Sequence, residues 1–143
     1  MSEPSGKSSS PLDAIREKLR RYPQLSVVDE VASITVKAQT PDGFDVSFHA
    51  GDGEYIVSME GWHAHFDTTQ IETALNCFAF GLSDTARLEV HSRGGRDYCW
   101  TLEAYEDGTW RTDSTTGQLF SRFWRKKIVR YLRNAVIVSD EVS

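Results

Sequence analysis

Cysteines are scarce in this 143-residue sequence, and long apolar runs are missing. Cys77 and Cys99 do not form a CxxC pair, so we interpret both as reduced core thiols, with a single disulfide as the alternative. No apolar run approaches the roughly 20 residues of a membrane span. The first eleven residues also lack the apolar core of a signal peptide. These absences predict a cytoplasmic protein with no membrane partner.

Recognisable catalytic motifs are missing as well. The sequence holds no GxSxG motif, and its glycine-rich segment 92–97 lacks the Gly-Lys-Ser or Gly-Lys-Thr ending of a phosphate-binding loop. Cys77 precedes Phe78 within an apolar helical pattern, a setting that makes a thiol inert. Glu89 and Glu103 can meet across a hairpin, but we expect them to be offset or to be neutralised by Arg87 or Arg111. The sequence therefore favours a non-enzymatic role.

Acidic residues outnumber basic ones, 21 against 16, which gives a net charge of -5. A negative surface repels phosphate backbones, so nucleic acid is disfavoured as a partner, although a local basic patch can still act. Six cations and no acid fall within residues 121–136. We interpret these cations as the solvent-facing side of an amphipathic helix. The alternative is a surface for phosphates, acidic partners or anionic lipid.

Composition and periodicity divide the chain into a tail and one domain. Residues 1–10 are rich in serine, glycine and proline and are predicted to be disordered, whereas residues 11–143 are predicted to form a single domain. Apolar residues at helical spacing predict three helices. The first starts at Pro11, the second follows the capping box of Asp67 and Gln70, and the third follows a turn at 114–117 and ends at about Val138. Strand alternation occupies 33–38, 44–49, 54–60, 86–92, 98–106 and 110–113.

The resulting element order is α-βββ-α-βββ-α. It predicts an α+β fold with a single antiparallel sheet of about six strands and helices packed on one face. The alternation of apolar and polar residues along each strand indicates one buried face and one wet face. We therefore expect the second face of the sheet to be open for binding.

The segment GWHAHFD, residues 61–67, raises the question of a metal site. Residues two apart on a strand share a face, so His63 and His65 can offer two imidazoles to zinc. His91, on another predicted strand, is the candidate third ligand. Three protein ligands with an open water position are typical of a catalytic zinc, so these histidines are the candidate centre of a small metal-dependent enzyme.

The competing interpretation of this segment needs no metal. Alternation buries Trp62, Ala64 and Phe66 and leaves both histidines facing solvent, while the Asp67 carboxylate is committed to capping the helix. A bulge at Gly61 is expected to set this parity, because an unbroken strand from residue 54 would turn the histidines inward. We therefore predict no cofactor, with zinc as the alternative.

Aromatic residues supply the main candidate binding site. The sequence has four tryptophans and five tyrosines, most of them expected in the core. Tyr105 and Trp110 on the open face would form an aromatic patch of the kind that interfaces use, and Arg93 and Arg96 flank the glycines of a predicted hairpin nearby. Open-face aromatics of this kind also favour a homodimer.

The element order, small size and acidic charge are similar to those of small bacterial chaperones of the type III secretion class and of other dimeric α+β adaptors. The third strand of the second half departs from the secretion-chaperone pattern. The absence of a coherent catalytic set and the aromatic, half-wet strands predict a homodimeric, non-catalytic adaptor or chaperone-like module that binds a protein partner through its open sheet face. The alternative is a small metal-dependent or ligand-binding enzyme centred on His63, His65 and His91.

Overall fold

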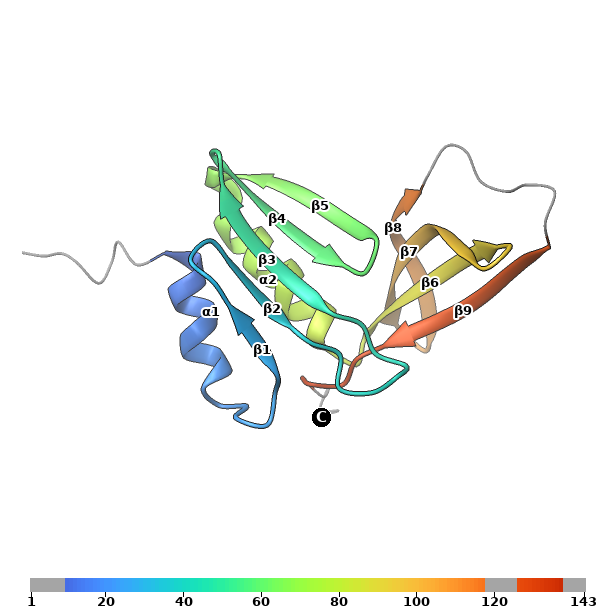
Figure 1. Ribbon diagram of the computed structural model, residues 1–143, viewed down its shortest axis with the longest axis horizontal. Helices are drawn as coiled ribbons and strands as arrows, with labels where there is room; N and C mark the ends of the chain where they lie inside the picture. The colour runs from blue at the N-terminus through green and yellow to red at the C-terminus, as the bar shows by residue number, and fades with distance from the viewer. Residues whose placement is uncertain (1–9, 118–125, 138–143) are drawn as a thin grey trace, which may run out of the picture.

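The computed structural model describes residues 10–117 and 126–137 (Figure 1). Its helical elements are α1 (Pro11–Leu19), the 3₁₀ turn η2 (Thr68–Gln70) and α2 (Ile71–Leu82). Its strands are β1 (Val27–Asp29), β2 (Ser33–Val36), β3 (Val46–Gly51), β4 (Glu54–Met59), β5 (Trp62–Asp67), β6 (Ala86–Arg93), β7 (Arg96–Glu106), β8 (Thr109–Gly117) and β9 (Lys127–Arg133). Most of the predicted tail and residues 118–125 of the predicted last helix lie outside the described residues.

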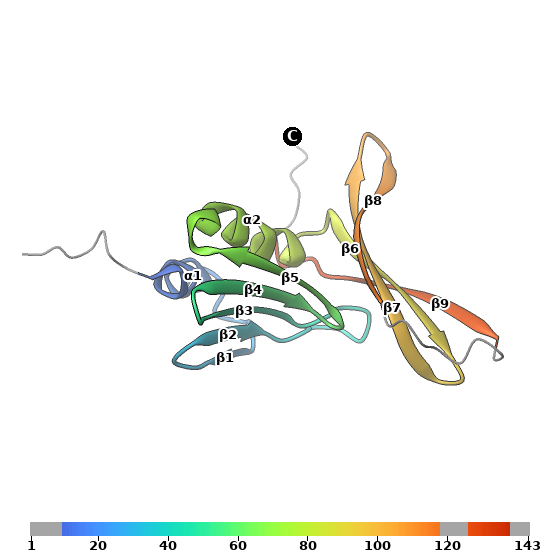
Figure 2. The ribbon, with the colours of Figure 1, turned by 90° about the horizontal axis from the view of Figure 1, so that it is seen from above.

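The α+β class is confirmed, but the prediction of a single six-stranded sheet is wrong. The strands form two antiparallel sheets, one of order β1-β2-β3-β4-β5 and one of order β8-β7-β6-β9 (Figures 1 and 2). After β5 the chain enters α2, and β6 then starts a new sheet by pairing with β7 and β9. The β5 strand meets the second sheet through side-chain contacts, such as the hydrogen bond of 3.0 Å from Trp62 Nε1 to Ser114 Oγ.

The predicted helix at the C-terminal end is also wrong where the structure describes it. Residues 127–133 form β9, which pairs antiparallel with β6 and places Leu132 opposite Leu88. The sequence KIVRYLR fits both a helical stripe and strand alternation, and its β-branched and aromatic residues favour the strand. Pairing with β6 favours the strand over the helix, because it buries Leu132 and leaves Tyr131 on the opposite side of the sheet.

A tight turn replaces the bulge predicted at Gly61. β4 and β5 are separate strands that pair with Met59 opposite Trp62, and Glu60 in the turn has a φ of 55°. The expected parity is confirmed, since Trp62 is buried while His63 and His65 are exposed. Gly61 is needed because a Cβ there would lie 2.2 Å from the indole of Trp100, which packs against this turn.

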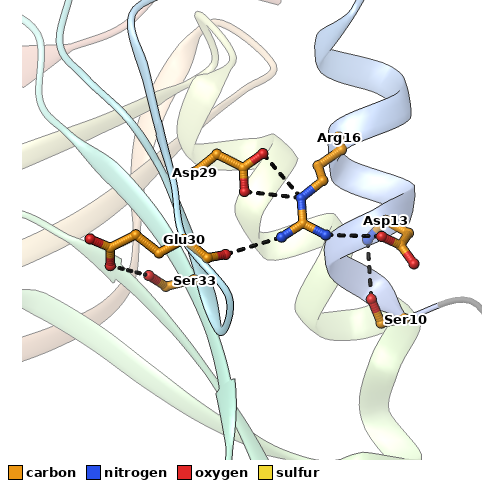
Figure 3. Close-up of polar contacts among 6 residues, drawn as sticks. All are labelled: Ser10, Asp13, Arg16, Asp29, Glu30 and Ser33. Carbon is orange, nitrogen blue, oxygen red and sulfur yellow. Dashed lines mark hydrogen bonds and ion pairs between the residues drawn. The ribbon is translucent and has the colours of Figure 1, made fainter.

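The first sheet has a short strand that the sequence pattern did not reveal, β1. Arg16 ties α1 to it: Nε donates to both carboxylate oxygens of Asp29, at 3.0 and 3.1 Å, and the guanidinium also donates to the carbonyl oxygen of Glu30 (Figure 3). Asp13, one turn earlier in α1, accepts from the same guanidinium at 2.9 Å. These bonds hold α1 beside the edge of the first sheet.

The core lies between α2 and the first sheet and continues under the second sheet. As predicted, Asp67 and Gln70 form a capping box at the start of the helical segment. Phe78 of α2 meets Phe48 of β3 edge to face, with ring centroids 6.1 Å apart. Gly81 lets α2 approach the sheet, because a Cβ at this position would lie 2.6 Å from Met59 Cε.

Asn134, directly after β9, joins the end of the second sheet to the rest of the molecule. Its side chain is buried; Oδ1 accepts from the Phe44 amide at 3.1 Å, and Nδ2 donates to the carbonyl oxygens of Phe44 and Gly81, both at 3.0 Å. One amide therefore satisfies three backbone groups from the β2–β3 connection and the last turn of α2. Buried backbone groups of this kind are costly to leave unpaired.

We predict that Asn134→Ala lowers the free energy of unfolding by at least about 2 kcal/mol, since it strands buried donors and acceptors that cost about 1–3 kcal/mol each. Urea denaturation followed by circular dichroism measures the change. Gln24→Ala is the matched control, because Gln24 is an exposed residue in the turn after α1. Equal unfolding midpoints for the two variants would contradict the role assigned to Asn134.

Candidate binding surface

Strand alternation gives the second sheet a buried side and an opposite side that carries polar and aromatic residues. Leu88 and Val90 of β6 are buried, so Arg87, Glu89 and His91 point the other way. Register and ring contacts place residues of β7, β8 and β9 beside them. We call this side the aromatic–arginine face; its central residues are Arg87, Glu89, His91, Tyr98, Glu103, Tyr105, Trp110, Tyr131 and Arg133.

Arg87 lies at the centre of the aromatic–arginine face. Its guanidinium carbon is 4.4 Å from the ring centroid of Trp110 and 4.2 Å from that of Tyr131. The two rings come from opposite edges of the sheet, β8 and β9, and hold the guanidinium between them (Figure 1 shows the strands). Cation–π contacts of this kind stabilise the arginine and fix its direction.

Glu103, opposite Arg87 on the neighbouring strand β7, forms an ion pair with this arginine. Its Oε1 lies 2.5 Å from Arg87 Nε, and the residue is only 8% exposed although it sits on the outer side of a single sheet. The neighbouring Thr101 is equally buried and shares a hydrogen bond of 3.0 Å with Thr115. The layer of stacked side chains above therefore shields the sheet from water at this point.

Glu89 links the centre of the face to its far end. One oxygen accepts from the Tyr131 hydroxyl at 3.0 Å and the other lies 3.0 Å from His91 Nε2. The Glu89 carboxylate raises the pKa of the Tyr131 hydroxyl, and desolvation acts in the same direction. The His91 ring lies 6.1 Å from Tyr98, and the Arg93 guanidinium is 5.5 Å from the same tyrosine ring. Contacts thus run from Arg93 to Trp110 without a break.

Several large side chains of the face remain open to solvent. Tyr105 is 46% exposed and Tyr131 48%, and Val129, two residues before Tyr131 on β9, is 38% exposed. Tyr105 and Trp110 form an edge-to-face pair with ring centroids 5.2 Å apart, and the Arg133 guanidinium lies 5.4 Å from Trp110. Exposed tyrosine, tryptophan and arginine side chains held in fixed positions are the usual composition of protein interfaces.

The candidate binding residues from the sequence occupy two places. Tyr105 and Trp110 are brought together, while Arg93 and Arg96 pair at the end of the β6–β7 hairpin, with Arg93 against Tyr98 and Arg96 exposed. Sequence reasoning did not assign Arg87, Tyr131 and Arg133 to this binding surface. The alternation of β6 is the signal for Arg87, but Tyr131 and Arg133 were hidden by the helical interpretation of their segment.

The three candidate zinc ligands are divided between the two sheets. His63 and His65 stand on β5 of the first sheet with ring centroids 5.4 Å apart, and His65 Nδ1 lies 3.1 Å from Glu54. His91 stands on β6 of the second sheet, bound to Glu89. No group of three or more histidine, cysteine, aspartate or glutamate side chains that could hold a metal occurs within 10–117 and 126–137.

The cysteines and the Glu89 and Glu103 carboxylates have structural surroundings that do not suit catalysis. Cys77 and Cys99 are both free, and burial raises the pKa of the Cys77 thiol to about 12, which keeps it protonated. Glu89 and Glu103 do not meet: Glu89 lies opposite Thr101, and Glu103 lies opposite Arg87 and pairs with it. This arrangement offers binding chemistry rather than a paired acid and base.

We predict that Glu89→Gln lowers the pKa of Tyr131, because it removes the carboxylate that accepts the hydroxyl proton. The sign follows from the raised pKa: the hydroxyl–carboxylate bond is present while Tyr131 is protonated and is lost as the pH rises through its pKa. Carbon-13 NMR of labelled tyrosine, with Tyr131→Phe to assign the signal, measures it. Glu106→Gln is the control; an unchanged Tyr131 pKa in Glu89→Gln would refute the contact.

Comparisons with protein-family models, with curated proteins and with solved structures found no match to this chain. In the part of the chain that the structure describes, no helix is long and apolar enough to cross a membrane. We therefore infer a function from the chemistry of the protein's own surfaces, among which the aromatic–arginine face has the largest connected set of contacts between aromatic and charged side chains.

Proposed function

We propose that this protein is a non-catalytic binding module, of the adaptor or chaperone-like kind, that holds a protein segment on the aromatic–arginine face. The observation that supports this most is the position of Arg87 between the rings of Trp110 and Tyr131. Arginine, tryptophan and tyrosine are the residues that most often dominate the binding energy of protein interfaces. Here they form one cluster with exposed edges.

Preorganisation strengthens the proposal. Binding normally immobilises long side chains at a cost of about 0.5–1.5 kcal/mol each. The Arg87 side chain is already fixed by two rings and by Glu103, and the Tyr131 hydroxyl is fixed by Glu89. A partner that docks on this face would therefore lose little free energy to the ordering of these side chains.

The charge of the face favours an acidic partner that also carries apolar side chains. Both acids of the cluster are engaged within it, Glu103 with Arg87 and Glu89 with Tyr131 and His91. Arg133 reaches Trp110 from the β9 side, and Lys127 at the other end of β9 makes no ion pair with any described residue. The face thus presents cations on a chain whose net charge is -5, which steers acidic segments to it.

The location of the face offers a backbone contact as well. β9 ends the strand order of the second sheet, so its outer edge has no strand partner among the described residues. An extended peptide that pairs with such an edge gains main-chain hydrogen bonds, while neighbouring side chains supply specificity. Tyr131 and Val129 stand on this strand and would contact the side chains of a peptide paired there.

The same edge is where a homodimer would form, and we include a cytoplasmic homodimer in the proposal. Ile128 is 57% exposed on β9, next to Val129 and Tyr131. Arg130, in the middle of the strand, is neutralised by two hydrogen bonds of 2.8 Å to Asp97, which lower the pKa of that carboxyl. Two copies of β9 could then approach antiparallel without bringing two unpaired arginines together.

The competing proposal, a small metal-dependent or ligand-binding enzyme centred on His63, His65 and His91, has no observation in its favour. Its three histidines come from two sheets, and the described residues hold no group suited to a metal. A catalytic zinc site needs three converging ligands and an open position. Zinc binding therefore stays only the alternative that the sequence left open.

We predict that a random peptide-display library enriches acidic peptides with aromatic or aliphatic residues on the purified full-length protein. Affinity for a selected peptide should fall by about thirty-fold or more in Trp110→Ala, since truncation of a hot-spot residue costs about 2 kcal/mol or more. It should fall by several-fold in Arg133→Gln, which removes one cation beside Trp110. Fluorescence anisotropy measures the affinity, and native mass spectrometry measures the oligomer in parallel. Circular dichroism verifies that each variant is folded.

Arg111→Gln is the matched control, because Arg111 lies on β8 but is 62% exposed in its side chain and outside the cluster. The control should bind as the wild type does. Peptides that bind all three variants equally would overturn the proposal. Salt-dependent binding of a single-stranded RNA oligomer that is lost in Trp110→Ala would also overturn it, because the face would then be a nucleic-acid binding site.

A further inference from the structure

A concave surface separate from the aromatic–arginine face lies between α1 and α2. It has a volume of about 310 Å³, at the small end of the range for ligand cavities. Ile15 and Leu19 of α1 form one wall, Leu75 and Phe78 of α2 form the other, and Val136 and Ile137 close one end. The surface is largely apolar, as binding sites for small organic molecules usually are.

The position of α1 beside this cavity is fixed by contacts with the first sheet. Arg16 ties the helix to Asp29 of β1 and to Glu30 directly after it (Figure 3), while Ile15 and Leu19 of the same helix line the cavity beside α2. At the other end, Val136 and Ile137 are held by hydrogen bonds of 3.0 Å from their amides to the Leu82 carbonyl oxygen. The walls therefore belong to segments anchored independently of each other.

Two cations stand at the rim of the cavity. Lys18 and Arg21 both line it and both are exposed, and neither makes an ion pair with any described residue. The neighbouring Arg20, in contrast, is paired with Glu17 at 2.7 Å. The rim therefore combines two uncompensated positive charges with an apolar interior, and Tyr22 and Asn76 add polar groups beside them.

We propose that this cavity binds a medium-chain fatty acid, with its carboxylate at Lys18 and Arg21 and its aliphatic chain between α1 and α2. Charge-assisted hydrogen bonds to a carboxylate are strong, and arginine and lysine are its usual partners in proteins. Each buried methylene adds about 0.8 kcal/mol of transfer free energy. The short cavity suits a medium aliphatic chain better than a long one.

The test is titration of the full-length, delipidated protein with decanoate below its micelle concentration, followed by isothermal calorimetry and by NMR of carboxyl-labelled decanoate. We expect saturable one-to-one binding. The double variant Lys18→Gln, Arg21→Gln should weaken it by about ten-fold, which corresponds to 1.4 kcal/mol. Ala79→Trp, which places a large ring in the cavity, should abolish it. Arg20→Gln is the matched control and should bind as the wild type does.

Three outcomes would overturn the proposal. The first is absence of saturable binding, and the second is equal affinity for decanoate and for the uncharged decanol, since the rim cations would then have no role. The third concerns the chain itself: residues 138–143 follow Ile137 directly and include Asp140 and Glu141. Decanoate binding that occurs only in the full-length variant Asp140→Asn, Glu141→Gln would identify that segment as the occupant.

Discussion

The side chain of Asn134 is the contact on which the arrangement of the two sheets depends. A buried amide with one acceptor and two donors has few ways to be satisfied, and here all of them involve backbone groups of Phe44 and Gly81. The adjacent Arg133 amide donates to the Asp42 carbonyl oxygen at 2.7 Å, which fixes the same junction from the neighbouring residue. The end of β9 is thereby set relative to α2 and the β2–β3 connection.

The fixed end of β9 also determines which of its side chains face the core and which face outward. Once Asn134 is buried, strand alternation turns Leu132 into the core and Tyr131 and Arg133 outward. A shift of one residue would reverse this and remove Tyr131 from Arg87. The aromatic–arginine face is therefore assembled from opposite edges of one sheet, with Trp110 on β8 and Tyr131 on β9, and its geometry depends on a contact made outside the face.

The sequence predicted the local features well and the non-local ones poorly. The capping box at Asp67, the alternation that exposes His63 and His65, and the pairing of Tyr105 with Trp110 all follow from residues close in the chain. The division into two sheets does not, because it depends on β6 choosing β9 as a partner about forty residues later, and pairing of distant segments leaves no local pattern. The helical interpretation failed for residues 127–133 for the same reason, and it hid Tyr131 and Arg133 of the central cluster.

The net charge of -5 disfavours anionic partners for the chain as a whole, yet each of the two surfaces carries cations that make no ion pair with a described residue: Lys127 on β9, and Lys18 and Arg21 at the cavity between α1 and α2. The difference lies in how acids are placed. On the second sheet Glu89 and Glu103 are bound to side chains of their own face, and at the helical cavity Glu17 binds Arg20 while Lys18 and Arg21 have no such partner. Glu103 compensates Arg87 and Glu17 compensates Arg20, whereas Lys18, Arg21 and Lys127 have no such partner among the described residues. Screening beyond about 8–10 Å makes this local balance count more than the total. Two separate surfaces on an acidic protein can thus each favour an anionic ligand, one through stacked aromatic side chains and the other through an apolar cavity.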